Sequence, residues 1–278
     1  MDNKYTKFKT IYLIVISAIV VISIIAGCYY HLSSGINFKF GKHSFSSNSG
    51  NKKGSTVVYE ESKTLGSDIK NITIKADVAD LSIEYGDAYK VDYRYVDYNA
   101  PQVEVDGKNL KITEKAGIKS HPANVQDIDC TLKITIPEGC TLEDIDIDID
   151  CGNIQYEDII CEDLILDADL GNIQLEHITC DDLKVNADLG NVEFTDSTIK
   201  NIEANADCGA ITFENCTFKK GDMNADLGSI VVSGDFESLK ASCNLGSIDI
   251  VSIKPEDDLD LDLKADLGSI TVNGKIWK

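Results

Sequence analysis

Aspartate is the residue type whose spacing in this sequence suggests chemistry most directly. Six aspartates recur about every 19 residues, each two positions before a glycine: Asp150, Asp169, Asp188, Asp207, Asp226 and Asp266, with Asn244 in the place of a seventh. Carboxylates stacked one above another repel by roughly 1 kcal/mol in water, and a hard divalent cation such as Ca²⁺ would relieve that repulsion. In the competing hypothesis each carboxylate accepts hydrogen bonds from backbone N–H groups of a turn. Because the calcium-binding GGxGxD motif is absent, we favour this second hypothesis and expect no cofactor, with Ca²⁺ as the alternative.

Residues suited to catalysis are scattered rather than clustered. The four histidines are His31, His43, His121 and His177, and no GxSxG, HExxH or phosphate-binding glycine loop is present. The sequence also lacks the CxxC pairs of structural zinc sites. We therefore expect no enzyme, and a polysaccharide-active enzyme on a parallel β-helix remains the weaker alternative.

A fixed repeat positions the aspartates. The glycines that follow them are separated by four intervals of 19 residues and then by 18 and 22: Gly152, Gly171, Gly190, Gly209, Gly228, Gly246 and Gly268. After each glycine, apolar and polar residues alternate with the period of two that is typical of a strand. Repeats this short bury a core only by stacking on one another. The fold class expected is all-β, a parallel β-solenoid of about 19-residue coils.

A second alternating segment precedes each glycine and predicts further inward columns. One column holds Leu164, Leu183, Ile202 and Leu239, and another Ala168, Ala187, Ala206, Ala225 and Ala265. We expect these columns to end in an inward leucine beside the glycine, at Leu170, Leu189, Leu227 and Leu267. The glycine would make the corner of the coil, where a β-carbon is penalised.

Asparagines and cysteines also fall at repeating positions. Asn153, Asn172 and Asn191 follow the glycines, and Asn186, Asn205 and Asn224 precede the Ala-Asp pairs, so we expect hydrogen-bonded amide ladders. Nine cysteines are an odd number, and most lie at expected core positions. Cys161 and Cys180 would stack as neighbours, and we favour buried free thiols there over a disulfide.

The N-terminus predicts a membrane segment. Lys4, Lys7 and Lys9 precede an uncharged apolar run from Thr10 to Tyr30, which is long enough for a transmembrane helix. The lysines favour an N-terminus in the cytoplasm and export of the remainder. In the alternative, Ile25-Ala26-Gly27-Cys28 is a lipoprotein cleavage box, in which Cys28 is lipidated. Either way the protein would be tethered to the bacterial cell membrane through its N-terminus.

Composition divides the chain into four parts. We expect a cytoplasmic tail over 1–10, the membrane segment over 11–30, a flexible Ser/Gly/Asn-rich stalk over 31–65 and the solenoid over 66–278. Within the solenoid, residues 66–148 would form irregular coils and 149–278 the regular repeats. The net charge of −21 excludes nucleic acid as a partner, because phosphate backbones bind cationic surfaces.

The sequence resembles a bacterial family of presumed adhesins, or β-strand-repeat proteins, whose activity is not established. The resemblance covers roughly residues 66–278 and rests on 72–85, on Leu132-Lys133-Ile134-Thr135-Ile136-Pro137-Glu138-Gly139 and on the Asp-Leu-Gly-Asn-Ile type of repeat. It implies a β-solenoid at the bacterial envelope, with adhesion inferred and envelope-stress signalling proposed for some relatives. It supplies no catalytic residues.

These features together predict a membrane-anchored, extracytoplasmic binding module, adhesin-like and without catalysis, for an unknown extracellular or envelope ligand. The alternative is an envelope stress sensor that binds cationic peptides or other envelope components. The sequence leaves the ligand and the oligomeric state open.

Overall fold

The computed structural model describes residues 58–66, 68–96, 100–114 and 130–277. In these residues the chain is almost entirely β-structure, with one short 3-10 helix. No helix in this part of the chain has the length and apolar character needed to span a bilayer. The expected membrane segment from Thr10 to Tyr30, with Cys28, and the stalk up to residue 57 lie outside the described residues.

The strands of the N-terminal section are β1 (Val58–Thr64), β2 (Asn71–Val78), β3 (Asp80–Gly86), β4 (Lys90–Val96), β5 (Gln102–Asp106), β6 (Asn109–Thr113) and β7 (Thr131–Pro137). The strands of the repeats are β8 (Asp144–Cys151), β9 (Ile154–Glu157), β10 (Asp163–Leu170), β11 (Ile173–Glu176), β12 (Thr179–Leu189), β13 (Val192–Thr195), β14 (Thr198–Cys208), β15 (Ile211–Leu227), β16 (Ile230–Leu245) and β17 (Ile248–Ser252). The C-terminal end holds η2 (Glu256–Asp258), β18 (Asp260–Leu267), β19 (Ile270–Val272) and β20 (Lys275–Ile276).

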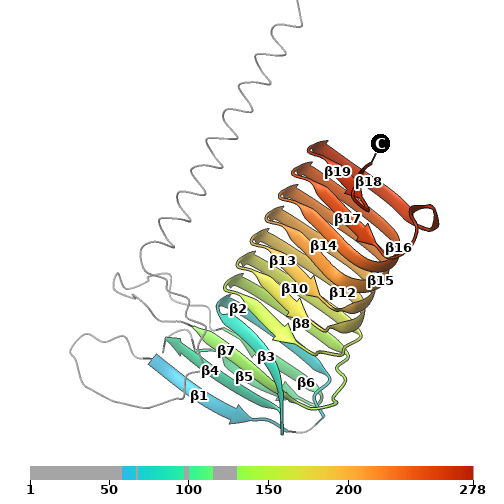
Figure 1. Ribbon diagram of the computed structural model, residues 1–278. Coiled ribbons are helices and arrows are strands. Elements are labelled where there is room, and N and C mark those ends of the chain that lie inside the picture. Colours follow the sequence, from blue (N-terminus) through green and yellow to red (C-terminus); the bar gives the residue numbers. More distant parts are fainter. Residues whose placement is uncertain (1–57, 67, 97–99, 115–129, 278) are drawn as a thin grey trace, which may run out of the picture. The chain divides into compact units, whose positions relative to one another are not determined.

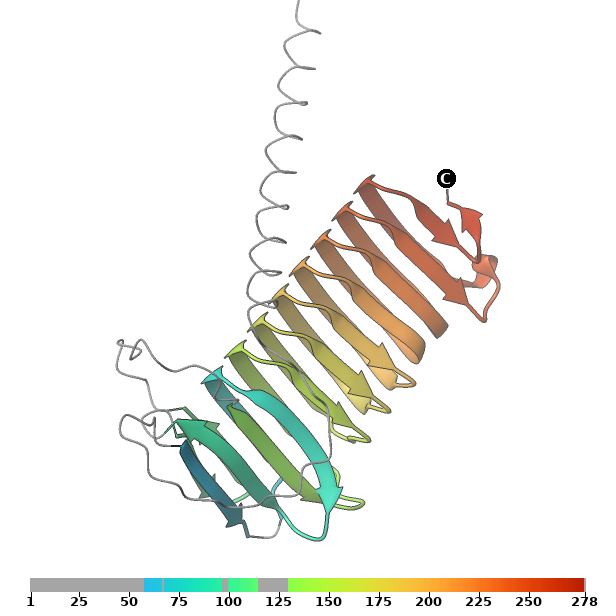
Figure 2. The ribbon, with the colours of Figure 1, turned by 60° about the vertical axis from the view of Figure 1, so that its left-hand side comes forward.

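The repeats form a parallel β-solenoid, as predicted. Each coil turns sharply at its glycine, and each strand pairs in parallel with its equivalent in the next coil (Figures 1 and 2). The register follows the 19-residue period, so Leu164 lies opposite Leu183, and Leu183 opposite Ile202. Matching residues therefore stack along the axis of the solenoid.

The core is a continuous apolar shaft built from these stacks. The column that follows the glycines is fully buried from β9 to β17 and consists of Ile154, Ile173, Val192, Ile211, Ile230 and Ile248. Two residues further on, the rings of Phe194 and Phe213 stack with centroids 4.9 Å apart and planes 6° apart. Alternation with period two thus puts one set of side chains in the shaft and the other on the surface.

Glycine is required at the corner because the backbones of successive coils touch there. A β-carbon on Gly171 would lie 1.7 Å from the carbonyl oxygen of Gly152, far inside van der Waals contact. The same position in the first coil holds Ala79, whose carbonyl oxygen faces Gly152 in turn. The predicted superposition of the glycines from coil to coil is confirmed.

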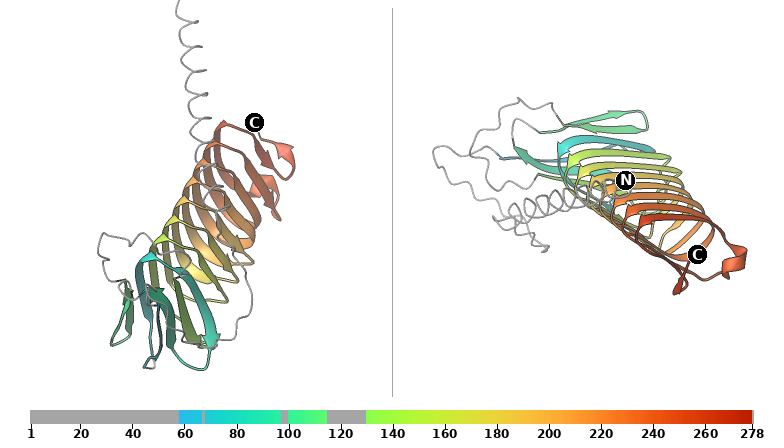
Figure 3. Two further views of the ribbon diagram at one scale, coloured as in Figure 1. Left: turned by 90° about the vertical axis from the view of Figure 1, so that its left-hand side faces the viewer. Right: turned by 90° about the horizontal axis from the view of Figure 1, so that it is seen from above.

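The N-terminal section joins the stack out of chain order. Strand β2 lies between β6 and β8, and β3 lies between β7 and β9, all in parallel pairing. Antiparallel strands then extend the sheets at this end of the solenoid, with β5 beside β6, β4 beside β7 and β1 beside β4 (Figure 3). At the other end, β20 pairs antiparallel with β19, and Trp277 packs against the last coils.

Candidate binding face

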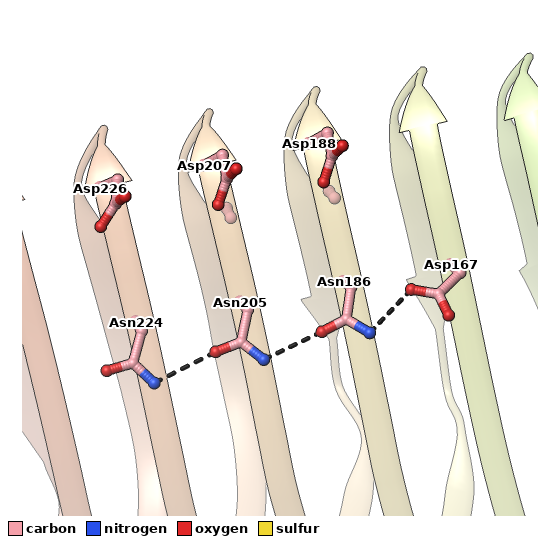
Figure 4. A pocket seen from close by; sticks show the side chains of 9 residues that line it. Asp167, Asn186, Asp188, Asn205, Asp207, Asn224 and Asp226 are labelled. Carbon is pink, nitrogen blue, oxygen red and sulfur yellow. Dashed lines mark hydrogen bonds between the residues drawn. The ribbon is translucent and has the colours of Figure 1, made fainter.

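The six predicted aspartates lie in one column on the outside of the solenoid, on the strands that lead into the glycine corners. The strand register adds Asp77, which precedes Val78 as Asp150 precedes Cys151. Asp188, Asp207 and Asp226 stand one above another on successive coils (Figure 4). We call this set, from Asp77 to Asp266 with Asn244, the acidic column.

Hydrogen bonds to the turn backbone do not explain the acidic column. Among the described residues, no backbone N–H donates to the carboxylates of Asp150, Asp169, Asp188 or Asp207. The turn N–H groups are used between coils instead; for example, Gly171 N donates to Leu189 O at 3.0 Å. The hypothesis of backbone-bonded turn aspartates, favoured from the sequence, is therefore wrong. The six carboxylates are exposed. Asp226 Oδ1 accepts a hydrogen bond from Asn244 Nδ2 at 2.8 Å, and Asp266 lies 3.1 Å from Lys264 Nζ.

The aspartates perturb each other electrostatically. The pKa of Asp188 is raised, first by partial desolvation and then by the charges of Asp169 and Asp207 on the coils either side. The pKa of Asp150 is raised for the same reasons, with Asp77 and Asp169 as the neighbouring charges. Both shifts mean that the negative charge is disfavoured at these two positions. Any cationic group that approaches the acidic column is attracted.

A ladder of amides runs parallel to the acidic column, two residues earlier on each strand. Asn224 Nδ2 donates to Asn205 Oδ1 at 3.1 Å, Asn205 Nδ2 to Asn186 Oδ1 at 2.9 Å, and Asn186 Nδ2 to Asp167 Oδ1 at 2.7 Å (Figure 4). Between the amides and the acidic column, the buried Ala187 and Ala206 form the floor of a shallow open groove of about 500 Å³. The predicted amide ladder is confirmed, and it makes one wall of this groove.

The expected inward leucines are on the outside of the molecule. Leu170, Leu189 and Leu267 are 47%, 38% and 62% exposed and Leu227 is half-buried, so the prediction that the core columns end with inward leucines is wrong. Leu245, at the same position of another coil, is 39% exposed. The alternation breaks at the corner, because the buried alanine is followed by two exposed residues, the aspartate and then the leucine. These residues share one register column, which we call the leucine edge: Val78, Cys151, Leu170, Leu189, Cys208, Leu227, Leu245 and Leu267.

The amide ladder on the far side of the corner is structural. Asn172 Oδ1 accepts hydrogen bonds from both Asn191 N and Asn191 Nδ2, at 3.0 and 3.3 Å. Asn153 Oδ1 accepts the same pair of bonds from Asn172. These amides hold the corners of successive coils together, as the sequence predicts, and their hydrogen-bonding capacity is largely used by one another.

A different cluster could hold a metal ion. On the second corner of the coils, Glu176, His177 and Asp196 each place one ligand atom within 4.8 Å of the others, and all three residues are exposed. Asp158 lies 3.3 Å from Nδ1 of His177. Imidazole with two carboxylates suits a transition metal such as Zn²⁺ better than Ca²⁺. Sequence alone did not reveal this set, because the residue type changes along its 19-residue period from Asp158 to His177 to Asp196.

The described cysteines are all free thiols. Cys161 and Cys180 are buried neighbours, and a hydrogen bond with the Cys161 thiol, followed by burial, raises the pKa of Cys180, which keeps it protonated. Cys151 is exposed, because it occupies the leucine edge rather than the core. The preference for free thiols at Cys161 and Cys180 is confirmed.

One solved structure of a known protein shares this architecture, and two others are less similar. A presumed adhesin from Bacteroides fragilis NCTC 9343 is 18% identical, covers 78% of this chain and 98% of its own, and superposes with a TM-score of 0.55. A presumed adhesin from Parabacteroides merdae ATCC 43184 is 11% identical over 77% of this chain and 95% of its own, with a TM-score of 0.46. A presumed lipid-binding protein from Parabacteroides distasonis ATCC 8503 is 21% identical over 77% and 95%, with a TM-score of 0.48. At these identities, the B. fragilis structure supports the fold alone.

Among curated proteins no match was found. The model of the Toastrack DUF4097 family matches residues 69–276. That match includes the N-terminal section from β2 onward, every regular coil and the C-terminal strands. The chain belongs to the Toastrack DUF4097 family.

Proposed function

We propose that this protein is an adhesin-like binding module of the bacterial envelope, tethered to the membrane through its N-terminus and without catalytic activity. One observation carries the proposal: a rigid stack of coils displays three parallel columns on one side, the amide ladder, the acidic column and the leucine edge. We call these three columns the ladder face. Repetition in register gives a long, uniform surface suited to an extended partner, whereas an enzyme needs one site with distinct groups.

The tether is supported by the sequence from Lys4 to Tyr30. A helix in the membrane with the N-terminus inside would place the solenoid outside the cell. The presumed adhesin role of the B. fragilis relative agrees with such a location. The proposal therefore joins a surface position with a binding face.

The experiment uses bacterial cells that produce the full chain. Protease added to intact cells should digest the solenoid. Untreated cells that produce the protein should adhere to their target surface several-fold better than cells without it. A ladder-face variant carrying Leu170→Asn, Leu189→Asn and Asp188→Asn should lose the gain. The matched control carries Val231→Asn, Val251→Asn and Glu214→Gln, which change exposed side chains on the strands that follow the glycines. Protection from protease, or equal adherence of the two variants, would refute the proposal.

A second function is favoured by the charge of the same face. An envelope sensor that binds a cationic stressor through the acidic column would need the membrane segment to pass on its signal. Removal of Met1–Tyr30 should then abolish the transcriptional response to the stressor and leave ligand binding intact. If the protein is instead an adhesin, the chain without this segment should still bind its target in solution, and even the full chain should give no transcriptional response.

A further inference from the structure

We infer that the ladder face is a docking site for a basic amphipathic helix of about 20 residues, lying along the axis of the solenoid. This inference rests on the proposed binding function and names the chemistry of its partner. It arises from the exposure of the leucine edge beside the acidic column.

The leucine edge is a continuous apolar surface. Its eight residues follow one another in the register of eight stacked strands, and with a strand spacing of about 4.8 Å they span roughly 34 Å. Isolated exposed leucines are common on proteins, but a contiguous apolar row of this extent is typical of an interaction site. Exposure of 38–62% at four of its leucines leaves substantial area for a partner to bury.

The charge beside the leucine edge selects the partner. Every residue of the edge is preceded by a member of the acidic column, and partial desolvation together with neighbouring carboxylates raises the pKa values of Asp150 and Asp188. A second copy of the solenoid placed against this face would add carboxylates to a chain of net charge −21. An anionic membrane surface is repelled for the same reason. A polypeptide with lysines or arginines beside an apolar stripe pairs its charges with the acidic column and buries its stripe on the leucine edge.

The spacing of the columns selects the conformation of that polypeptide. An α-helix repeats its apolar stripe every turn of about 5.4 Å, and six turns cover about 32 Å, close to the length of the leucine edge. An extended strand repeats a face every two residues, or about 6.6 Å, and falls out of step with the coils much sooner. A helix can lay its apolar stripe on the leucines while its basic flank reaches into the groove between the acidic column and the amides.

The amide ladder gives this groove a neutral second wall. Asn186 and Asn205 use their amide groups mainly on each other and on the next coils. They contribute no positive charge that would repel the basic flank of the helix. One wall of the groove therefore carries carboxylates. The other wall carries the uncharged amides of Asn186, Asn205 and Asn224, which do not repel a cation (Figure 4).

The test uses the full chain in a neutral detergent and a synthetic 20-residue helix with a leucine stripe and a lysine flank. Fluorescence anisotropy should give saturable binding that weakens as sodium chloride screens the charges. Leu170→Asn with Leu189→Asn, and separately Asp188→Asn with Asp207→Asn, should each weaken binding at least tenfold. Val231→Asn with Val251→Asn, and Glu193→Gln with Glu214→Gln, alter outward-facing groups on the strands that follow the glycines and should change the affinity less than twofold. Unchanged far-ultraviolet circular dichroism checks that each variant is folded.

Several outcomes would overturn the inference. Equal loss in the ladder-face and control variants would mean diffuse charge attraction. Equal binding of a proline-containing peptide of the same composition would exclude the helix, and stronger binding of neutral or anionic vesicles would assign the face to membranes. Dimerisation that the leucine substitutions abolish would assign it to a second copy. Adherence of cells through this face without peptide binding would leave the proposed function standing and remove only the helix.

Discussion

Gly190 provides a direct test of the stacking, because its position leaves no room for a methyl group. A β-carbon placed on Gly190 would lie 1.6 Å from the carbonyl oxygen of Gly171 and 2.6 Å from its carbonyl carbon. Real β-carbons essentially never approach another heavy atom within 3.0 Å. Gly190→Ala therefore requires the two coils to separate by about 1.4 Å at the corner, the difference between 3.0 and 1.6 Å.

The cost follows from the hydrogen bonds that cross this interface. Gly171 N donates to Leu189 O at 3.0 Å, Ile173 N to Asn191 O at 2.9 Å, and Asn191 N to Asn172 Oδ1 at 3.0 Å. Separation by about 1.4 Å would stretch these bonds beyond 4 Å, where they no longer count as hydrogen bonds. Three lost bonds, some leaving a buried donor without a partner, amount to about 3–5 kcal/mol. That is a large part of the stability of a typical domain.

The measurement is urea unfolding together with native-state hydrogen exchange. Gly190→Ala should lower the free energy of unfolding by about 3–5 kcal/mol, and the amides of Gly171 and Ile173 should lose protection locally. Gly66→Ala is the matched control, because nothing lies within 4 Å of a β-carbon there, and it should change stability by less than about 0.5 kcal/mol. If the two variants unfolded alike, the coils would not touch at the glycines and the stacking argument would fail.

Three further predictions concern charge and burial. Lowering the pH from neutral toward the ordinary aspartate pKa of 3.8 should raise the free energy of unfolding, because the raised pKa values of Asp150 and Asp188 make the folded state take up protons first. At lower pH the opposite contribution appears, since the hydroxyl of Tyr93 donates to Glu61 and lowers the pKa of Glu61; a steady fall in stability from pH 7 downward in urea titrations would contradict this account. Sodium chloride should raise the melting temperature by screening the acidic column, whereas a chelator should leave it unchanged; a calcium-specific rise in calorimetry would instead favour the Ca²⁺ ladder. Tyr156→Phe should stabilise the protein by about 1 kcal/mol, because the buried Tyr156 hydroxyl has no hydrogen-bond partner among the described residues; a loss of stability in urea unfolding would show that the hydroxyl is satisfied.

The regular coils could be predicted in detail because one period governs both strands. The column of Ile154 and Ile173 is recognisable from spacing alone, and so is the corner glycine that follows each aspartate. The N-terminal section could not be predicted in this way. Its first coil, β2 and β3, stacks between segments that lie further along the chain, and no sequence period records a stacking order that differs from chain order.

Only part of the candidate site could be predicted from the sequence. The acidic column and the amide ladders follow from spacing, since residues 19 apart must lie on adjacent coils. The role of the aspartates did not follow, because the turn N–H groups that could have bonded to them bond to the neighbouring coil instead. Leu170, Leu189, Leu227 and Leu267 were predicted to lie in the core, because the alternation of inward and outward side chains was assumed to continue beyond the buried alanine. In the structure the aspartate and the leucine before each corner glycine are successive outward positions, and the hydrophobicity of the sequence does not reveal this break in the alternation.

The sequence by itself determined the period, the parallel stacking and the contents of the shaft, because repeated apolar residues at alternating positions have only one way to be buried together. Only the tertiary structure decided which way the corner residues face. Each strand ends at the corner, where the buried alanine is followed by an exposed aspartate and an exposed leucine before the chain turns at the glycine. That turn, made possible by a glycine with no β-carbon, converts a residue expected in the core into the apolar edge of a binding face.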